Sequence, residues 1–150
     1  MAVLTMDIST SEPTKSATAI DTLPRLPEHI AVINPPLRVS KPYVDDPLLS
    51  FAAPLRFSML LRQRGCQVTA LDAFLLSPIE QKDDCLAIGP QAIDIVRSLQ
   101  SSGASLAIVF YSSFHRARGV PGDDVAELMG AIEKEIPGMP VYLVDGYDTT

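Results

Sequence analysis

The feature that most constrains the fold is the alternation of short apolar runs with segments that have helix signals. The apolar runs occupy residues 29–34, 67–71, 105–111 and 141–144, and the helical segments between them occupy 54–64, 90–101 and 123–136. This alternation is typical of a parallel sheet with helices on both faces. We therefore predict an α/β fold, a doubly wound parallel sheet of Rossmann or flavodoxin type, with strand order 2-1-3-4 from right-handed crossovers.

Start and stop signals bound the helical segments. Pro54 suits a first turn, Gly65 and Gly103 suit the position after a last turn, and Asp123 can cap the last helix. The residues expected to form the buried stripes of the helices are Phe57, Leu60 and Leu61; Ala92, Ile93, Val96 and Leu99; and Val125, Leu128, Met129, Ile132 and Ile136. We expect a long loop at 35–47, and the pattern at 72–86 indicates no particular element.

Residues 1–28 are rich in Ser, Thr and Pro and show no sustained period. We expect them to be a disordered leader before one domain at 29–150. Only residues 145–150 follow the fourth predicted strand, which would leave that strand as an uncovered edge. A complete flavodoxin-like domain would add one more helix and strand, so we expect this domain to be incomplete.

Charge and composition argue against several classes of protein. The net charge of −6 disfavours general binding to nucleic acids or to anionic membranes, both of which require a basic face. No apolar stretch is long enough to span a membrane, and the first residues do not form a signal peptide, so we expect a cytoplasmic protein. Cys66 and Cys85 are the only cysteines and belong to no Cys/His cluster, which argues against a self-contained zinc or iron–sulfur site.

In a doubly wound sheet, ligands bind beyond the carboxyl ends of the strands, here between the first and third strands. Residues 34–47, 112–121 and 145–148 should converge there. The first of these segments contains neither GxGxxG nor a P-loop, which removes most support for a nicotinamide or ATP site. The second carries hydroxyl and basic side chains that could hold a phosphate, and a solvated loop is the alternative.

Few side chains suggest catalysis. His115 could serve as a metal ligand or acid/base group, but a loop histidine with neither role is the alternative, and we predict no catalytic residue and no metal ligand. Asp45 and Asp46 could bind a cation or a polar ligand, but an exposed acidic loop is the favoured interpretation. His29, at the opposite end of its strand, and Cys66 are assigned structural roles.

Two motifs together resemble a known family. Ile33-Asn34-Pro35-Pro36 ends the first predicted strand, and residues 58–68, SMLLRQRGCQV, end a helix and enter the second, with Asp72 just after it. This layout is similar to the N-terminal cobalamin-binding domain of cobalamin-dependent radical S-adenosylmethionine enzymes, where a strand ends in NPP and a helix ends like YLRERGHEV. The likeness covers roughly residues 29–148.

The resemblance implies a corrinoid over the carboxyl ends of the strands, with its nucleotide tail beside the first, third and fourth strands. The residues that would contact it are Asn34, Pro35, Pro36, Ser112, Ser113, Phe114, His115, Gly146 and Tyr147. Other cobalamin-binding domains carry DxHxxG after the first strand, and its His ligates cobalt. Asn34-Pro35-Pro36 replaces that motif here, so the resemblance implies no cobalt ligand from this loop. Phe114 and Asp145 depart from the family's usual Leu and Gly.

Radical S-adenosylmethionine enzymes bind a 4Fe-4S cluster through Cys-x-x-x-Cys-x-x-Cys, which this chain lacks. The resemblance therefore implies that the cluster and S-adenosylmethionine belong to a catalytic domain outside this chain, acting in cis or in trans. The resulting hypothesis is a corrinoid-binding domain of a radical enzyme, in most family members a methyltransferase. The alternative is a non-catalytic flavodoxin-like interaction or regulatory module. A phospho-receiver is disfavoured because Tyr111-Ser112 stands where its Asp would be.

Overall fold

The computed structural model describes residues 26–40, 52–76, 79–82, 85–111 and 123–145. The elements in these ranges are, in chain order, β1 (His29–Asn34), β2 (Leu37–Ser40), α1 (Ala52–Gln63), β3 (Gln67–Asp72), α2 (Ala73–Leu76), β4 (Glu80–Gln81), β5 (Cys85–Ile88), α3 (Ala92–Ser102), β6 (Leu106–Tyr111), α4 (Asp124–Glu135) and β7 (Val141–Asp145).

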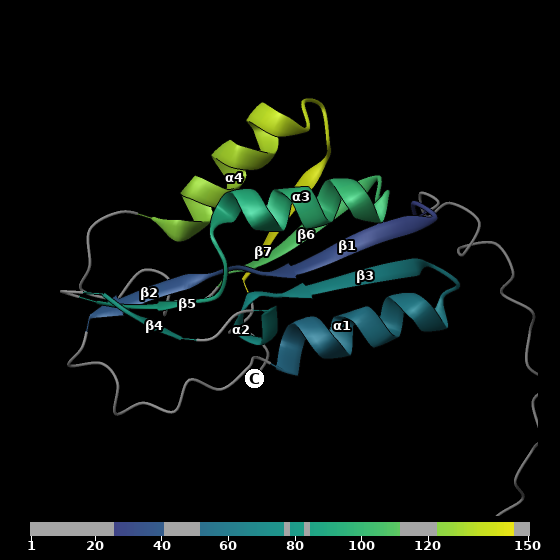
Figure 1. Ribbon diagram of the computed structural model, residues 1–150. Coiled ribbons are helices and arrows are strands. Elements are labelled where there is room, and N and C mark those ends of the chain that lie inside the picture. Colours follow the sequence, from purple (N-terminus) through teal and green to yellow (C-terminus); the bar gives the residue numbers. More distant parts are fainter. Residues whose placement is uncertain (1–25, 41–51, 77–78, 83–84, 112–122, 146–150) are drawn as a thin grey trace, which may run out of the picture.

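The centre of the fold is a parallel sheet with strand order β3-β1-β6-β7 (Figure 1). The segments predicted as second, first, third and fourth strands therefore lie side by side in one sheet. The numbering differs from 2-1-3-4 because the structure contains β2, β4 and β5, which the sequence analysis did not predict. The predicted α/β class is confirmed, because the chain forms a parallel sheet with helices.

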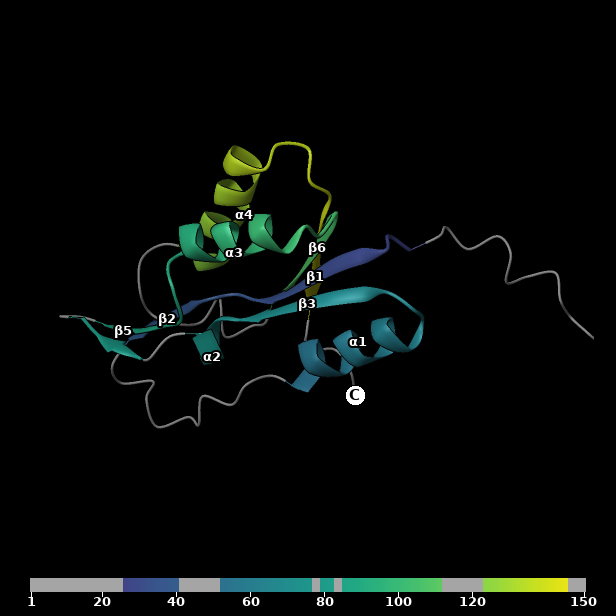
Figure 2. The ribbon, with the colours of Figure 1, turned by 45° about the vertical axis from the view of Figure 1, so that its right-hand side comes forward.

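Helices cover both faces of this sheet. Figure 1 and Figure 2 show α3 and α4 on one face and α1 on the other. On β1, Ala31 and Ile33 belong to the hydrophobic cluster beneath α3 and α4, whereas Ile30 and Val32 belong to the cluster beneath α1. Burial on both faces explains why β1 reads as an uninterrupted apolar run rather than an alternating one.

Two of the predicted helical stripes need correction. Leu61 is buried and Phe57 packs edge-to-face on Phe110, with ring centroids 5.6 Å apart, but Leu60 is exposed. In α3 the buried isoleucine is Ile95 rather than Ile93. One residue in each predicted stripe was misassigned because adjacent apolar residues fit the 3.6-residue period almost equally well.

The predicted boundaries of α4 and the end of α3 are confirmed. The Asp123 carboxylate accepts hydrogen bonds from the amides of Val125 and Ala126, both at 3.0 Å, and so caps α4. Gly103 follows α3 with φ of 71°, in the left-handed region that glycine tolerates. Val125, Leu128 and Ile132 are buried along α4, as predicted.

The three unpredicted strands form a second, antiparallel sheet with order β2-β5-β4, which we name the accessory sheet. It extends outward beyond the carboxyl end of β1 (Figure 1, Figure 2). The loop predicted at 35–47 is thus wrong for residues 37–40. There Leu37 and Val39 are buried and alternate with the half-buried Arg38 and Ser40. Prolines on both sides concealed this two-residue period.

Several expectations fall outside the described residues, among them residues 1–25 of the leader predicted at 1–28 and the acidic pair Asp45–Asp46. Within the described part of the chain, no helix is long and apolar enough to cross a membrane. Cys66 and Cys85 are both buried free thiols. His29 lies at the start of β1, where its Nε2 is 2.9 Å from Thr69 Oγ1, a contact that suits its predicted structural role.

Gly89 joins the accessory sheet to the rest of the fold through a very close backbone contact. Its φ is +92°, and a Cβ at this position would lie 2.8 Å from both the Cβ and the carbonyl oxygen of Ala73. Gly103 also has positive φ, at +71°, but a Cβ there would meet nothing within 4 Å. The two glycines therefore separate the effect of backbone conformation from that of steric contact.

We predict that Gly89→Ala lowers the free energy of unfolding by about 2–4 kcal/mol, since left-handed strain and overpacking both act there. Gly103→Ala should cost only about 1–2 kcal/mol, because strain acts alone. Urea denaturation of both variants measures the difference. Equal losses would show that the Ala73 contact is not sterically limiting.

Candidate functional site

The carboxyl ends of the four parallel strands meet at one edge of the central sheet. Their last residues are Asn34, Asp72, Tyr111 and Asp145. From β1 the chain passes to β3 on one side and then returns to β6 on the other, so the winding direction reverses between β1 and β6. Open α/β sheets bind ligands at such a reversal, which makes this edge the candidate site.

Asn34 and Asp72 form a polar contact across the ends of β1 and β3. The two residues are opposite one another in the strand register, and Asn34 Nδ2 donates to Asp72 Oδ1 at 2.8 Å. The same carboxylate oxygen accepts from the backbone amide of Phe74 at 3.0 Å, which orients the start of α2. The contact therefore fixes both strand ends and the turn that follows β3.

The second polar atom of the Asn34 side chain is buried without a partner. Asn34 is only 1% exposed, and among the described residues its Oδ1 accepts no hydrogen bond. Leaving a buried acceptor unsatisfied costs about 1–3 kcal/mol, and such groups are rare in native proteins. The carboxamide oxygen is therefore a free acceptor at the edge where a ligand is expected.

Pro35 and Pro36 end β1 and direct the chain into the accessory sheet. Neither residue has an amide hydrogen, so neither can donate to a sheet. Pro35 is buried and Pro36 half-buried, and β2 begins at the next residue, Leu37. The two prolines thus set the direction in which the chain leaves the candidate site.

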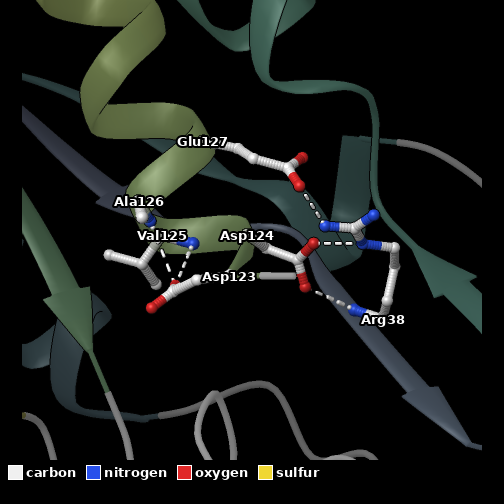
Figure 3. Close-up of polar contacts among 6 residues, drawn as sticks. All are labelled: Arg38, Asp123, Asp124, Val125, Ala126 and Glu127. Carbon is white, nitrogen blue, oxygen red and sulfur yellow. Dashed lines mark hydrogen bonds and ion pairs between the residues drawn. The ribbon is translucent and has the colours of Figure 1, made fainter. Parts of the chain in front are cut away.

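Arg38 on β2 binds two acidic residues of α4 (Figure 3). Its backbone amide donates to Asp124 Oδ2 at 2.8 Å, its Nε donates to Asp124 Oδ1, and its Nη2 donates to Glu127 Oε1. Asp124 is buried, whereas Glu127 is exposed. Acidic side chains at a helix N-terminus also interact favourably with the helix dipole.

The charges around Arg38 decide what this cluster can bind. Burial alone would lower the pKa of Arg38, but the hydrogen bonds and negative charges of Glu127 and Asp124 outweigh it and raise the pKa above its usual value. Arg38 therefore stays protonated. Among the described residues, the guanidinium of Arg38 is paired with two carboxylates, so it is not available to bind a phosphate or another anion.

The structure places three of the predicted cofactor-binding residues at the candidate site: Asn34, Pro35 and Pro36. The remaining six, Ser112, Ser113, Phe114, His115, Gly146 and Tyr147, lie outside the described residues. Sequence reasoning missed the cluster of Arg38, Asp124 and Glu127. The alternation of Leu37 and Val39 with polar residues was the one available signal, because it places Arg38 on a single face of a short strand.

In the parts of the chain that the structure describes, no three His, Cys, Asp or Glu residues are grouped so as to hold a metal ion. Comparisons of the chain with protein-family models, with curated proteins and with solved structures gave no match. The functional argument therefore rests on the residues and on their arrangement.

We predict that Asn34→Asp lowers the free energy of unfolding by about 3–5 kcal/mol at neutral pH, because it opposes two carboxylates at a buried contact. Exchanging the pair, with Asn34→Asp and Asp72→Asn combined, restores one amide and one carboxylate. This double variant should recover at least half of the loss in urea denaturation. A double variant no more stable than Asn34→Asp alone would show that the contact does not hold the strand ends.

Proposed function

We propose that this chain is a cobalamin-binding-type domain that positions a corrinoid for a radical S-adenosylmethionine catalytic domain outside the chain, with methyl transfer as the reaction class. The observation that carries the proposal is Asn34, which follows a buried parallel strand, precedes Pro35-Pro36 and holds an unsatisfied buried oxygen at the switch point of the sheet. The resemblance of this motif to the family supplies the identity of the ligand.

The described residues are compatible with a corrinoid in two respects. A corrinoid carries primary amides around its ring, and an amide N–H is the donor that Asn34 Oδ1 lacks. Because Arg38 is already paired with Asp124 and Glu127, it is not available to a polyphosphate, and a ligand edge made of neutral amides fits better.

On this proposal the chain binds and orients, and the bound corrinoid supplies a methyl carrier. Asn34 would accept a hydrogen bond from a ring amide, while Asp72 keeps the carboxamide in place through Nδ2. Pro35 and Pro36 would present an apolar surface to the ring without competing donors. The chain's own residues would perform no bond-breaking step, which is left to the catalytic domain in cis or in trans.

A non-catalytic interaction module is the second candidate, and a surface feature favours it. Leu75 and Leu76, at the end of α2, and Ile79, just after it, are exposed, with Leu75 78% accessible. Neighbouring exposed apolar side chains of this size often mark a contact with another protein or domain. A catalytic domain docked on the corrinoid would also cover them, so ligand binding discriminates between the candidates.

The test is retention of hydroxocobalamin by the purified full chain, measured by equilibrium dialysis and by the visible spectrum of the protein peak after gel filtration. We expect retention by the wild type and about tenfold weaker binding by Asn34→Leu, because one buried hydrogen bond is lost. Arg97→Ala, which breaks an exposed Arg97–Asp94 ion pair on α3, is the matched control and should bind like the wild type.

A folded wild-type chain that retains no corrinoid would overturn the proposal and favour the interaction module. Equal weakening by Asn34→Leu and Arg97→Ala would show that binding does not depend on the candidate site. The catalytic part is tested separately, by seeking a Cys-x-x-x-Cys-x-x-Cys motif in the coding sequence beyond Thr150 or in a neighbouring gene.

A further inference from the structure

Among the residues that the structure describes, the accessory sheet has a small hydrophobic core of its own. Three buried residues, Leu37, Val39 and Ile88, form this core, with Phe74 and Leu86 partly buried against it. Phe74 belongs to α2, so this cluster fastens only one side of the accessory sheet to the rest of the fold. A core of this size provides little stability by burial alone.

Arg38 fastens the accessory sheet to α4. The contact involves the strand itself, since the backbone amide of Arg38 donates to Asp124 along with the side chain (Figure 3). The guanidinium donates one bond to Asp124 and one to Glu127, which restricts it more than a single exposed ion pair would, and the backbone amide adds a second bond to Asp124. The position of β2 therefore depends on this cluster.

The acidic half of the cluster is attached to the main core through α4. Asp124 is the first residue of α4, and the side chain of Asp123 caps the first turn of this helix. Val125 and Leu128, in the same part of the helix, are buried in the main core. Arg38 is thus the part that can move, and α4 is its anchor.

We propose that Arg38, Asp124 and Glu127 form a latch that holds the accessory sheet against α4 and thereby positions Pro35, Pro36 and Asn34. Only two residues separate Asn34 from β2, so a displacement of β2 is transmitted directly to the end of β1. When the latch is open, the accessory sheet moves as a flap at the carboxyl edge. Arg38 is in this sense a positioning residue, and the inference holds for the chain without ligand.

The test is hydrogen exchange of the unliganded full chain, resolved to individual amides by NMR. In Arg38→Gln we expect amides of β2 and β5 to exchange about tenfold or more faster, while those of β1 and β6 stay unchanged, since local opening is separate from global unfolding. In Arg38→Lys the exchange rates of these amides should lie between those of the wild type and Arg38→Gln, because lysine keeps the charge but not the forked geometry. Arg97→Ala should leave both sets unchanged.

The NMR chemical shift of the Asn34 side-chain amide reports on the position of this residue at the end of β1. We expect this chemical shift to change in Arg38→Gln and to remain unchanged in Arg97→Ala. If Arg38 only stabilised the fold, its replacement would not change the chemical shift of Asn34. If Arg38→Gln fails to fold, Glu127→Gln replaces it, because this variant keeps the buried Asp124 bonds and should give a smaller acceleration confined to the same strands. Unchanged exchange in β2 and β5, or equal acceleration in every strand, would overturn the latch.

Discussion

Burial of β1 on both faces is the constraint on which the rest of the structure depends. Ile30, Val32 and Ile33 have almost no solvent exposure, and β1 is paired on both sides, to β3 and to β6. A strand enclosed in this way leaves its backbone groups no contact with water, so every one must be paired within the sheet. Helix α1 packs against one face of the sheet and α3 against the other. The chain can therefore become polar only where β1 ends.

Asn34 stands at that boundary. Inside the sheet a polar side chain would be costly, and outside it water would satisfy any side chain equally well. At the boundary, the position of a carboxamide is dictated by Asp72 on one side, while its oxygen remains available on the other. This combination of a fixed donor and a free acceptor is what a binding site needs, because the oxygen is oriented before a ligand arrives.

Much of the central sheet could be predicted from sequence because its signals are local. Uniform apolar runs marked β1 and β6, and Asp123 and Gly103 marked helix ends by their own chemistry. The accessory sheet could not be predicted, because β2 has four residues and β4 two, and neither has enough length for a period to stand out. The Arg38–Asp124 contact joins residues 86 positions apart, and no local pattern indicates such a pairing. Of the candidate site, the NPP turn was visible in the sequence, whereas the geometry of Asn34 required the fold.

Pro35 and Pro36 have a consequence for how the two sheets can vary. Hydrogen-bonded pairing passes along a strand from one residue to the next, and two consecutive residues without amide hydrogens interrupt it. The registers of the central and accessory sheets are therefore uncoupled, although β1 and β2 follow one another in the chain. Changes of length or sequence in the accessory sheet can accumulate without shifting a single pair in the central one. The NPP turn thus separates the hydrogen-bond register of the central sheet from that of the accessory sheet.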